Sequence, residues 1–444
     1  MTRPTIVWLR RDLRLADNPA LAAAVARGGP VMPLYIRDET ADGDWPPGAA
    51  ARWWLASSLD VLEADLSARG GRLVRRQGES LAVFREVLAL TGADAVFWNR
   101  RYTPAGIARD TAVKAALRHA GIGAQSFKAC VLVEPMQVTG HVPSFSRFFE
   151  RWRGLREPVP PLAAPERLAT PALESEPLAL LPPDAPFWTP KLDASWSIGE
   201  AAARARLADF VETGVRHYAK GRHLPAAGHV SGLSPHLAMG EISPAAVLRA
   251  VPERLGFAFI RQLAWRDYAT FLLFREPLLP ERELLPGRRA IAWRDDPAAL
   301  GSWQRGETGY ELVDAGMRQL WATGWMHNRV RMVTASFLTK HLLIDWRYGQ
   351  RWFWETLVDA DLANNAMGWQ WSASVGTDAP DFVRIFDPVA QALKFDADGA
   401  YRHRWLGDAP RPAPIVEHKA ARARALAAYG AADGAVDGAT DGAG

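Results

Sequence analysis

Two serines near the middle of the chain have the chemistry of an anion site. The stretch GHVSGLSPHLAMGEISP, residues 228–244, places Ser231 and Ser234 on a loop that enters a helix at Pro235. Hydroxyls and free backbone amides at a helix start bind anions, and a diphosphate would suit them. The same serines would also serve as ordinary helix caps. The spacing alone therefore leaves both interpretations open.

A second segment, FIRQLAWRDY, combines aromatic and hydrogen-bonding side chains. Four of them recur at positions i, i+3, i+6 and i+7, which predicts a shared helical face: Phe259, Gln262, Trp265 and Arg266. Such a face would be an unusual hydrophobic core. It could form a wall for a planar heteroaromatic group, which would stack on the rings and hydrogen-bond to the amide.

A third segment, TGWMHNRVRMVTASFLTK, places Asn328, Arg331 and Met332 on one helical face. If Arg331 is buried, its guanidinium needs a carboxylate partner. Asp359 and Asp361, in LVDADLANNAMGWQW, are the nearest candidates. A surface helix with solvated arginines explains the pattern equally well.

Tryptophan is unusually abundant, with 19 residues in the chain. Nine of them crowd into the region from 293 to 371: Trp293, Trp303, Trp321, Trp325, Trp346, Trp352, Trp354, Trp369 and Trp371. Core packing accounts for most of these indoles, and spacing alone does not identify an electron path.

The elements that would position these residues fall into two classes. The N-terminal part alternates apolar strands at 4–9, 31–36, 72–75 and 95–99 with helices at 19–27, 52–69 and 79–90. This alternation predicts a parallel α/β sheet. From about residue 198 the pattern is helical. The predicted organisation is an α/β domain (1–130), a linker (131–197) that is Pro-rich and extended from 157 to 190, an all-helical domain (198–428) and a disordered, low-complexity tail (429–444).

The first strand-to-helix turn, WLRRDLRLADNPAL, lacks the G-x-G-x-x-G of a dinucleotide-binding Rossmann domain. A nicotinamide-dependent enzyme is therefore disfavoured, and the chemistry is expected in the helical half.

Composition narrows the function classes further. A net charge of +4 and a pI of about 9.3 permit a polyanionic partner without requiring one. The single cysteine, Cys130, rules out an intramolecular disulfide and fits a reducing cytoplasm. No His, Cys and carboxylate cluster has metal-ligand spacing, and no apolar run reaches membrane-spanning length. We expect a soluble, cytoplasmic, monomeric protein without a metal.

Several long strings in this sequence resemble the photolyase/cryptochrome family: WLRRDLRLADNPAL, LSPHLAMGEISP, QLAWRDY, TGYELVDAGMRQLWATGWMHNRVRM, YGQRWFWETLVDADLANNAMGWQWSAS and KFDADGAYRHRW. The matches are collinear from about residue 5 to 426. Within the family they are most like bacterial cyclobutane pyrimidine dimer photolyases of the class I type. The resemblance implies an N-terminal α/β antenna domain, a long linker and a C-terminal helical domain that holds U-shaped FAD.

The resemblance also implies roles for individual residues. Those matching the FAD site are Tyr218, Val230, Ser231, Gly232, Leu233, Ser234, Phe259, Gln262, Arg266, Asn328, Arg331, Asp359, Asp361 and Asn365. Asn365 matches the residue that faces flavin N5, where an amide can accept a hydrogen bond. Trp369, Trp346 and Trp293 match the tryptophan chain that reduces photoexcited flavin. Residues matching DNA- or lesion-contact positions are Arg222, Trp265, Asn328, Arg329, Met332, Trp371 and Gln391. Of these, Trp265 and Trp371 match the indoles that cradle a flipped-out dimer.

The implied activity is light-dependent repair of pyrimidine dimers in DNA, in which excited, reduced FAD lends an electron to an extruded lesion. A cryptochrome-like blue-light receptor and a non-catalytic DNA-binding flavoprotein are the alternatives. A second, antenna chromophore is expected to be possible. Its identity stays open because Gly106 stands where folate-binding members have a glutamate.

The chain departs from the family pattern at several positions. Gln262 replaces the glutamate usual in dimer photolyases and is familiar from (6-4) photolyases, but Asn328 and Met332 stand where those enzymes have two histidines. Val230 and Gly232 replace a threonine and an arginine of the phosphate segment, which removes one hydroxyl and one cation. Asp387 replaces an asparagine, and DAPDFV before it is also unusual. These departures predict weaker FAD binding or a divergent role.

Overall fold

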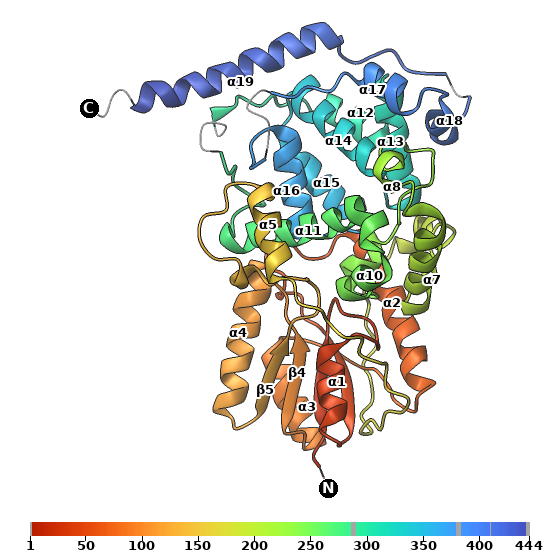
Figure 1. Ribbon diagram of the computed structural model, residues 1–444, viewed down its shortest axis with the longest axis vertical. Coiled ribbons are helices and arrows are strands. Elements are labelled where there is room, and N and C mark those ends of the chain that lie inside the picture. Colours follow the sequence, from red (N-terminus) through yellow and green to blue (C-terminus); the bar gives the residue numbers. More distant parts are fainter. Residues whose placement is uncertain (1, 286–289, 379–382, 409, 441–444) are drawn as a thin grey trace.

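The computed structural model describes residues 2–285, 290–378, 383–408 and 410–440. Figure 1 shows two halves: the strands and their helices at the N-terminal end, and a half built only of helices above them. The predicted fold class is confirmed: an α/β domain is joined by a long linker to an all-helical domain. No helix in the described ranges is long and apolar enough to cross a membrane.

The α/β domain contains one five-stranded parallel sheet with strand order β3-β2-β1-β4-β5. Its elements are β1 (Thr5–Leu9), α1 (Pro19–Ala26), β2 (Val31–Arg37), α2 (Ala49–Ser67), β3 (Val74–Gln77), α3 (Ser80–Thr91), β4 (Ala95–Asn99), α4 (Pro104–His119) and β5 (Gly123–Phe127). Because β1 pairs with both β2 and β4, the strand order reverses direction beside β1.

Both faces of the sheet are buried, as parallel sheets require. Ile6 and Trp8 of β1 face a hydrophobic cluster formed with α3 and α4. Val7 and Leu9, whose side chains point to the opposite face, join the larger core that contains α1 and α2. The near-continuous apolar sequence of β1 is explained by this two-sided burial.

The alternation continues beyond the last predicted strand. Helix α4 and strand β5 were not among the predicted elements. Strand β5 has the sequence GAQSF, which is only partly buried and carries one aromatic residue and no β-branched residue. An edge strand of this composition gives almost no sequence signal.

The segment between the domains is partly helical. It contains a 3₁₀ turn η1 (Pro135–Gln137), α5 (Phe145–Leu155), a 3₁₀ turn η2 (Ala185–Phe187) and α6 (Thr189–Asp193). Residues 156–184 have no helix or strand and run back along the α/β domain, where Leu168 N donates to Arg69 O at 2.9 Å and Glu176 N donates to Arg75 O at 3.0 Å.

The helical domain begins with α7. Its elements are α7 (Glu200–Asp209), a π-helical turn η3 (Phe210–Gly214), α8 (Tyr218–Gly221), α9 (Ser234–Met239), α10 (Pro244–Ala250), α11 (Glu253–Arg275), α12 (Pro297–Arg305), α13 (Glu311–Thr323), α14 (Asn328–Ser336), a π-helical turn η5 (Phe337–His341), α15 (Trp346–Thr356), α16 (Leu362–Ala373), α17 (Pro388–Phe395), α18 (Ala400–Leu406) and α19 (His418–Thr440).

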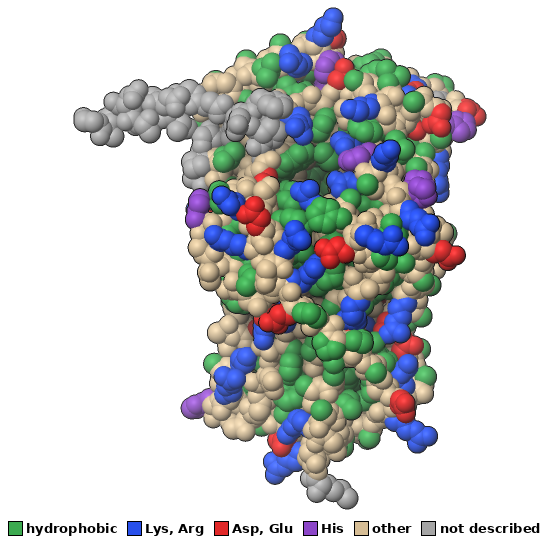
Figure 2. Space-filling model, in the orientation of Figure 1, with side chains coloured by type: hydrophobic (Ala, Val, Ile, Leu, Met, Phe, Trp, Pro, Cys, Tyr) green, Lys and Arg blue, Asp and Glu red, His purple; other side chains and the backbone are tan. Residues whose placement is uncertain are grey.

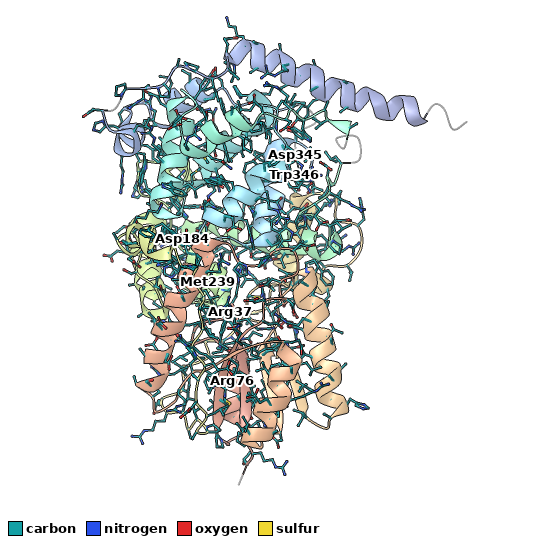
Figure 3. The ribbon with its side chains drawn as sticks, turned by 180° about the vertical axis from the view of Figure 1, so that it is seen from behind. Arg37, Arg76, Asp184, Met239, Asp345 and Trp346 are labelled. Carbon is teal, nitrogen blue, oxygen red and sulfur yellow. The ribbon has the colours of Figure 1, made fainter. Side chains whose placement is uncertain are left out.

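The two domains are joined by buried polar contacts at the carboxyl end of β1. The guanidinium of Arg14 donates to Gly240 O at 2.9 Å, and Leu13 N donates to Met239 O at 3.3 Å. Figure 3 shows Met239 where the two halves meet, with Trp346 deep in the helical half. A Cβ at Gly240, whose φ is +72°, would collide with the backbone of Arg11. The interface therefore requires glycine at this position.

Helix α19 crosses the boundary predicted at residue 429. It extends from His418 to Thr440. Tyr429 is fully buried, its ring packs edge-on against Trp293 at 6.2 Å, and its hydroxyl donates to Ala373 O at 2.6 Å. The repetitive composition of the tail gave no indication that Tyr429 packs against the core.

This packing predicts a clear stability effect. Tyr429→Ala should lower the free energy of unfolding by about 3–5 kcal/mol, because it leaves a cavity and an unpaired carbonyl. Leu426→Ala, on the exposed side of the same helix, should cost far less. Urea denaturation measures both, and equal, negligible effects would show that α19 does not pack on the core.

Candidate functional site

An ion pair connects two helices that carry part of the predicted site. Arg331 on α14 contacts Asp359, just before α16, with an N–O distance of 2.8 Å. The guanidinium also donates to Met326 O at 2.7 Å. Asp359 is only 4% exposed, so the pair predicted from the sequence is present and is largely removed from water.

Two acceptor oxygens, one of Asp359 and one of Asn365 on α16, lack hydrogen-bond partners among the described residues. Oδ1 of Asp359 is buried, and no described group hydrogen-bonds to it. Nδ2 of Asn365 donates to Gln350 O at 3.0 Å, which fixes the amide orientation and leaves Oδ1 on the other side. Among the hydrogen bonds of the described residues, none ends on that oxygen. Such acceptors fit the ring N–H groups of a planar cofactor such as an isoalloxazine.

The serine segment lies beside the same pair. The Ser234 hydroxyl accepts a hydrogen bond from Trp325 Nε1 at 3.1 Å, and Trp325 also lies 5.8 Å from the Arg331 guanidinium. Leu233 N donates to Ser231 Oγ at 3.3 Å within the loop before α9. Neither serine side chain caps that helix. Val230 is half-buried against the hydrophobic core. Trp325 was not singled out from the sequence as a site residue.

A second residue that the sequence did not single out is Arg206 on α7. Gly232 has φ +62°, and a Cβ built there would lie 2.5 Å from Nη1 of Arg206. Within the described chain Arg206 has no carboxylate partner, whereas its neighbour Arg204 pairs with Glu200. The Arg206 guanidinium therefore lies where a side chain at position 232 would begin.

Aromatic rings form another part of the predicted FAD site. Phe259 is 5% exposed and packs against Tyr218 at 5.2 Å and Phe210 at 4.7 Å. Burial raises the pKa of Tyr218 to about 12. Its phenol therefore stays protonated and available as a hydrogen-bond donor.

The remaining side chains of α11 point in different directions. Gln262 donates to the carbonyl of Ala258 in its own helix at 3.2 Å. Trp265 stacks on Phe145, and Arg266 donates to Cys130 O and Leu237 O toward the α/β domain. Arg266 thus contacts the domain interface and not Phe259 or Trp265. The helical face predicted from the sequence is therefore not one wall, because positions i to i+7 cover a broad arc of the helix surface.

The two indoles predicted to cradle a lesion are connected through one turn. Trp371 Nε1 donates to Asp378 O at 3.0 Å. The carboxylate of Asp378 accepts from Phe145 N at 2.9 Å, and the Phe145 ring covers Trp265. Both indoles are half-buried. They therefore belong to one cluster and not to separate cores.

The basic and amide side chains predicted to contact DNA or the lesion have contacts of their own. Arg329 hydrogen-bonds to His223 at 2.8 Å and lies 4.4 Å from the Phe395 ring. The exposed Asn328 contacts Met332 Sδ at 3.8 Å, Arg222 lies over Tyr218 at 5.8 Å, and Gln391 has a buried, unpaired Oε1. Figure 2 shows a hollow over helices α14, α15 and α16 with Lys and Arg side chains around its rim.

The three tryptophans of the predicted electron chain differ in exposure. Trp369 and Trp346 are buried, and Trp293 is half-buried beneath Tyr429. Trp369 packs on Gly349 of α15 and contacts Phe353 at 5.0 Å and Trp303 at 6.1 Å. In the described part of the chain, no direct ring contact joins the three.

A separate cavity of about 290 Å³ lies between the domains. It opens at the carboxyl ends of β1 and β4, where the strand order reverses, which is the usual ligand position in open α/β sheets. Five arginines line it: Arg10, Arg11, Arg100, Arg101 and Arg266. Asp361, predicted for the FAD site, caps α16 through Asn364 N at 2.9 Å and reaches this cavity. Over the described ranges, no three His, Cys, Asp or Glu side chains gather as a metal site.

Comparison with known proteins decides the family. Residues 5–166 match the DNA photolyase family model, and residues 259–411 match the FAD binding domain of DNA photolyase. A deoxyribodipyrimidine photo-lyase of Agrobacterium fabrum is 44% identical over 97% of this chain and 98% of its own length. The chain belongs to the photolyase/cryptochrome family. Cryptochrome-1 of Arabidopsis thaliana is 36% identical, over 93% of this chain and 64% of its own length.

Solved structures agree. A bacterial class III photolyase from Agrobacterium tumefaciens matches with a TM-score of 0.93 and 44% identity, over 97% of this chain and 98% of that one. An archaeal photolyase from Sulfolobus tokodaii, described with two FAD molecules, matches with a TM-score of 0.82 and 28% identity, over 96% of this chain and all of that one. The family assignment is confirmed. This relative is described as a class III photolyase, whereas the motifs were most like the class I type.

Two departures from the family pattern, Asp387 and the DAPDFV string, lie near each other in the sequence. Asp387 caps α17 by accepting from Val389 N at 2.9 Å, and its carboxylate lies 3.7 Å from His418. Residues 379–382 of the unusual DAPDFV string lie outside the described residues.

A buried histidine at the start of α14 makes the site sensitive to acid. His327 is 1% exposed, and its Nδ1 accepts from Arg329 N at 3.2 Å, which caps the helix. Burial, reinforced by the charges of Arg331 and Arg329, lowers the pKa of His327 to about 4. The neutral ring is therefore the folded form at neutral pH.

This shift predicts a pH-dependent stability. The pKa of His327 in the folded protein lies below its unfolded value of about 6.5, so neutral His327 stabilises the folded state fully above that pH. As the pH falls toward 4, about 2–3 kcal/mol of the free energy of unfolding is lost. His327→Asn keeps a capping side chain and should remove this slope. Denaturation at pH 7.5 and 4.5 measures the free energy of unfolding of both proteins. An identical change between the two pH values in wild type and variant would contradict the role of His327.

Proposed function

We propose that this protein repairs cyclobutane pyrimidine dimers in DNA in a light-dependent, FAD-dependent reaction. The observation that carries the proposal is the connection of Trp265 and Trp371 through one turn. The buried Arg331–Asp359 pair, with an acceptor oxygen that lacks a protein partner among the described residues, supports it. Photolyase relatives that cover nearly the whole chain support the same reaction class.

FAD would supply the photochemistry, lending one electron to the lesion and regaining it after the ring splits. The protein's residues would hold and orient both partners. Asp359 and Asn365 offer acceptors for ring N–H groups, and Tyr218 offers a phenol donor. Ser231, Ser234 and Arg206 lie together as polar and cationic groups for the diphosphate. The Arg206 guanidinium compensates for the cation absent at Gly232.

The lesion would enter between the two indoles. Stacking on aromatic rings binds an extruded base with little dependence on its sequence. Gln262 would donate its amide to a pyrimidine carbonyl, but it cannot supply a proton. Arg222, Arg329 and the basic rim would neutralise DNA phosphates. Trp369, Trp346 and Trp293 would reduce oxidised flavin from the surface.

The interdomain cavity is proposed as the site of a second, light-harvesting chromophore. Its position at the strand ends and its five arginines suit an anionic, planar ligand. The Sulfolobus tokodaii photolyase, which holds two FAD molecules, supports a second cofactor in this fold.

The decisive experiment is repair in light. The purified protein should carry FAD, visible by absorbance, and should restore dimer-containing oligonucleotide under blue light and reducing conditions but not in darkness. Flavin photoreduction without repair would favour a cryptochrome-like receptor. Colourless protein would favour a DNA-binding protein that has lost its flavin.

The pocket wall gives a second prediction. Trp371→Ala should weaken binding of dimer-containing DNA by about 1–3 kcal/mol through lost stacking. Trp321→Ala is the matched control, because Trp321 is 57% exposed and stacks on Trp352. Fluorescence anisotropy measures both affinities. An unchanged affinity in the first variant would reject Trp371 as a pocket wall.

A further inference from the structure

Asp378, in the turn after α16, contacts the supports of both indoles. Its backbone carbonyl accepts from Trp371 Nε1 at 3.0 Å. Its carboxylate accepts from Phe145 N at 2.9 Å and from the Tyr268 hydroxyl at 2.8 Å. A single residue therefore forms hydrogen bonds to three segments: α16, α11 and the start of α5.

The two carboxylate partners both hold Trp265. Phe145 stacks on Trp265 with ring centroids 3.7 Å apart and an interplanar angle of 8°. Tyr268 packs edge-on against the same indole at 5.6 Å and 71°. If the carboxylate were removed, Phe145 N would lose its partner and the Tyr268 hydroxyl would keep only the longer contact of 3.4 Å to Thr377 Oγ1. The stack behind Trp265 would then be free to shift.

The backbone of Asp378 is strained in a way that its contacts compensate. Its φ is +57°, a left-handed conformation that is uncommon for residues other than glycine, although Asp tolerates it. The carboxylate also lies at the N-terminus of α5, an 11-residue helix whose first amides favour negative charge. The turn thus aims the carbonyl at one indole and the carboxylate at the support of the other.

We propose that Asp378 is a positioning residue that sets the separation of Trp265 and Trp371, and thereby the discrimination between a two-base lesion and undamaged DNA. This inference rests on the proposed function. A pocket for a linked pair of pyrimidines needs a fixed width, and one residue hydrogen-bonded toward both walls provides it. Undamaged DNA would be bound through its phosphates, so a change in the separation of the two indoles should not alter its affinity.

Asp378→Ala should lower the affinity for dimer-containing duplex about tenfold while leaving undamaged duplex, FAD content and flavin photoreduction unchanged. Asp378→Asn should retain part of the discrimination, because its amide oxygen still accepts one hydrogen bond. Tyr268→Phe should lose less than Asp378→Ala. Asp209→Ala is the control for charge, because Asp209 is exposed and its side chain forms no hydrogen bond within the described part of the chain.

Competition anisotropy with matched damaged and undamaged duplexes measures the ratio of affinities. If Asp378→Ala and Tyr268→Phe keep the wild-type ratio of affinities, the inference is overturned. It is also overturned if they lose the same affinity for damaged and undamaged duplex. If Asp378→Ala loses FAD or fails to fold, Asp378→Asn and Tyr268→Phe still decide the question. A wild-type protein that shows no preference for dimers would instead overturn the proposed function.

Discussion

The ion pair between Arg331 and Asp359 is the constraint on which the helical half depends. It fixes α14 against the start of α16 at 2.8 Å, and these helices carry the residues nearest the proposed flavin. Burying a charge pair is unfavourable unless hydrogen bonds satisfy the remaining atoms. Met326 O satisfies part of the guanidinium, but Oδ1 of Asp359 has no protein partner. This oxygen is the acceptor that we propose for a ring N–H of the flavin.

The α/β domain is connected to the same network. Arg11, at the end of β1, donates its guanidinium to Ala360 O at 3.0 Å, between Asp359 and Asp361. Burial lowers the pKa of Arg11, and the nearby carboxylates compensate for the buried charge. A ligand in the arginine-lined cavity would thus contact residues that also position the flavin site. The two proposed chromophore sites share one rigid boundary.

Sequence reasoning found most of this arrangement where residue type and spacing carry a physical requirement. The strand–helix alternation around Trp8 and a carboxylate partner for Arg331 were both predictable. The weakly apolar β5, the anchor Tyr429 and the arc of α11 that separates Arg266 from Phe259 were not, because composition and periodicity do not report tertiary contacts. Arg206 and Asp378 escaped notice for the same reason: each acts on a residue distant in sequence.

The central claim is that one cavity presents flavin to a lesion held by two indoles. A crystal structure of the FAD-loaded protein with a dimer-containing duplex tests it most directly. The account predicts an extruded dimer between Trp265 and Trp371, with the flavin ring against Arg331 and Asn365. A dimer that remained stacked in the duplex, or a flavin bound only in the interdomain cavity, would contradict it.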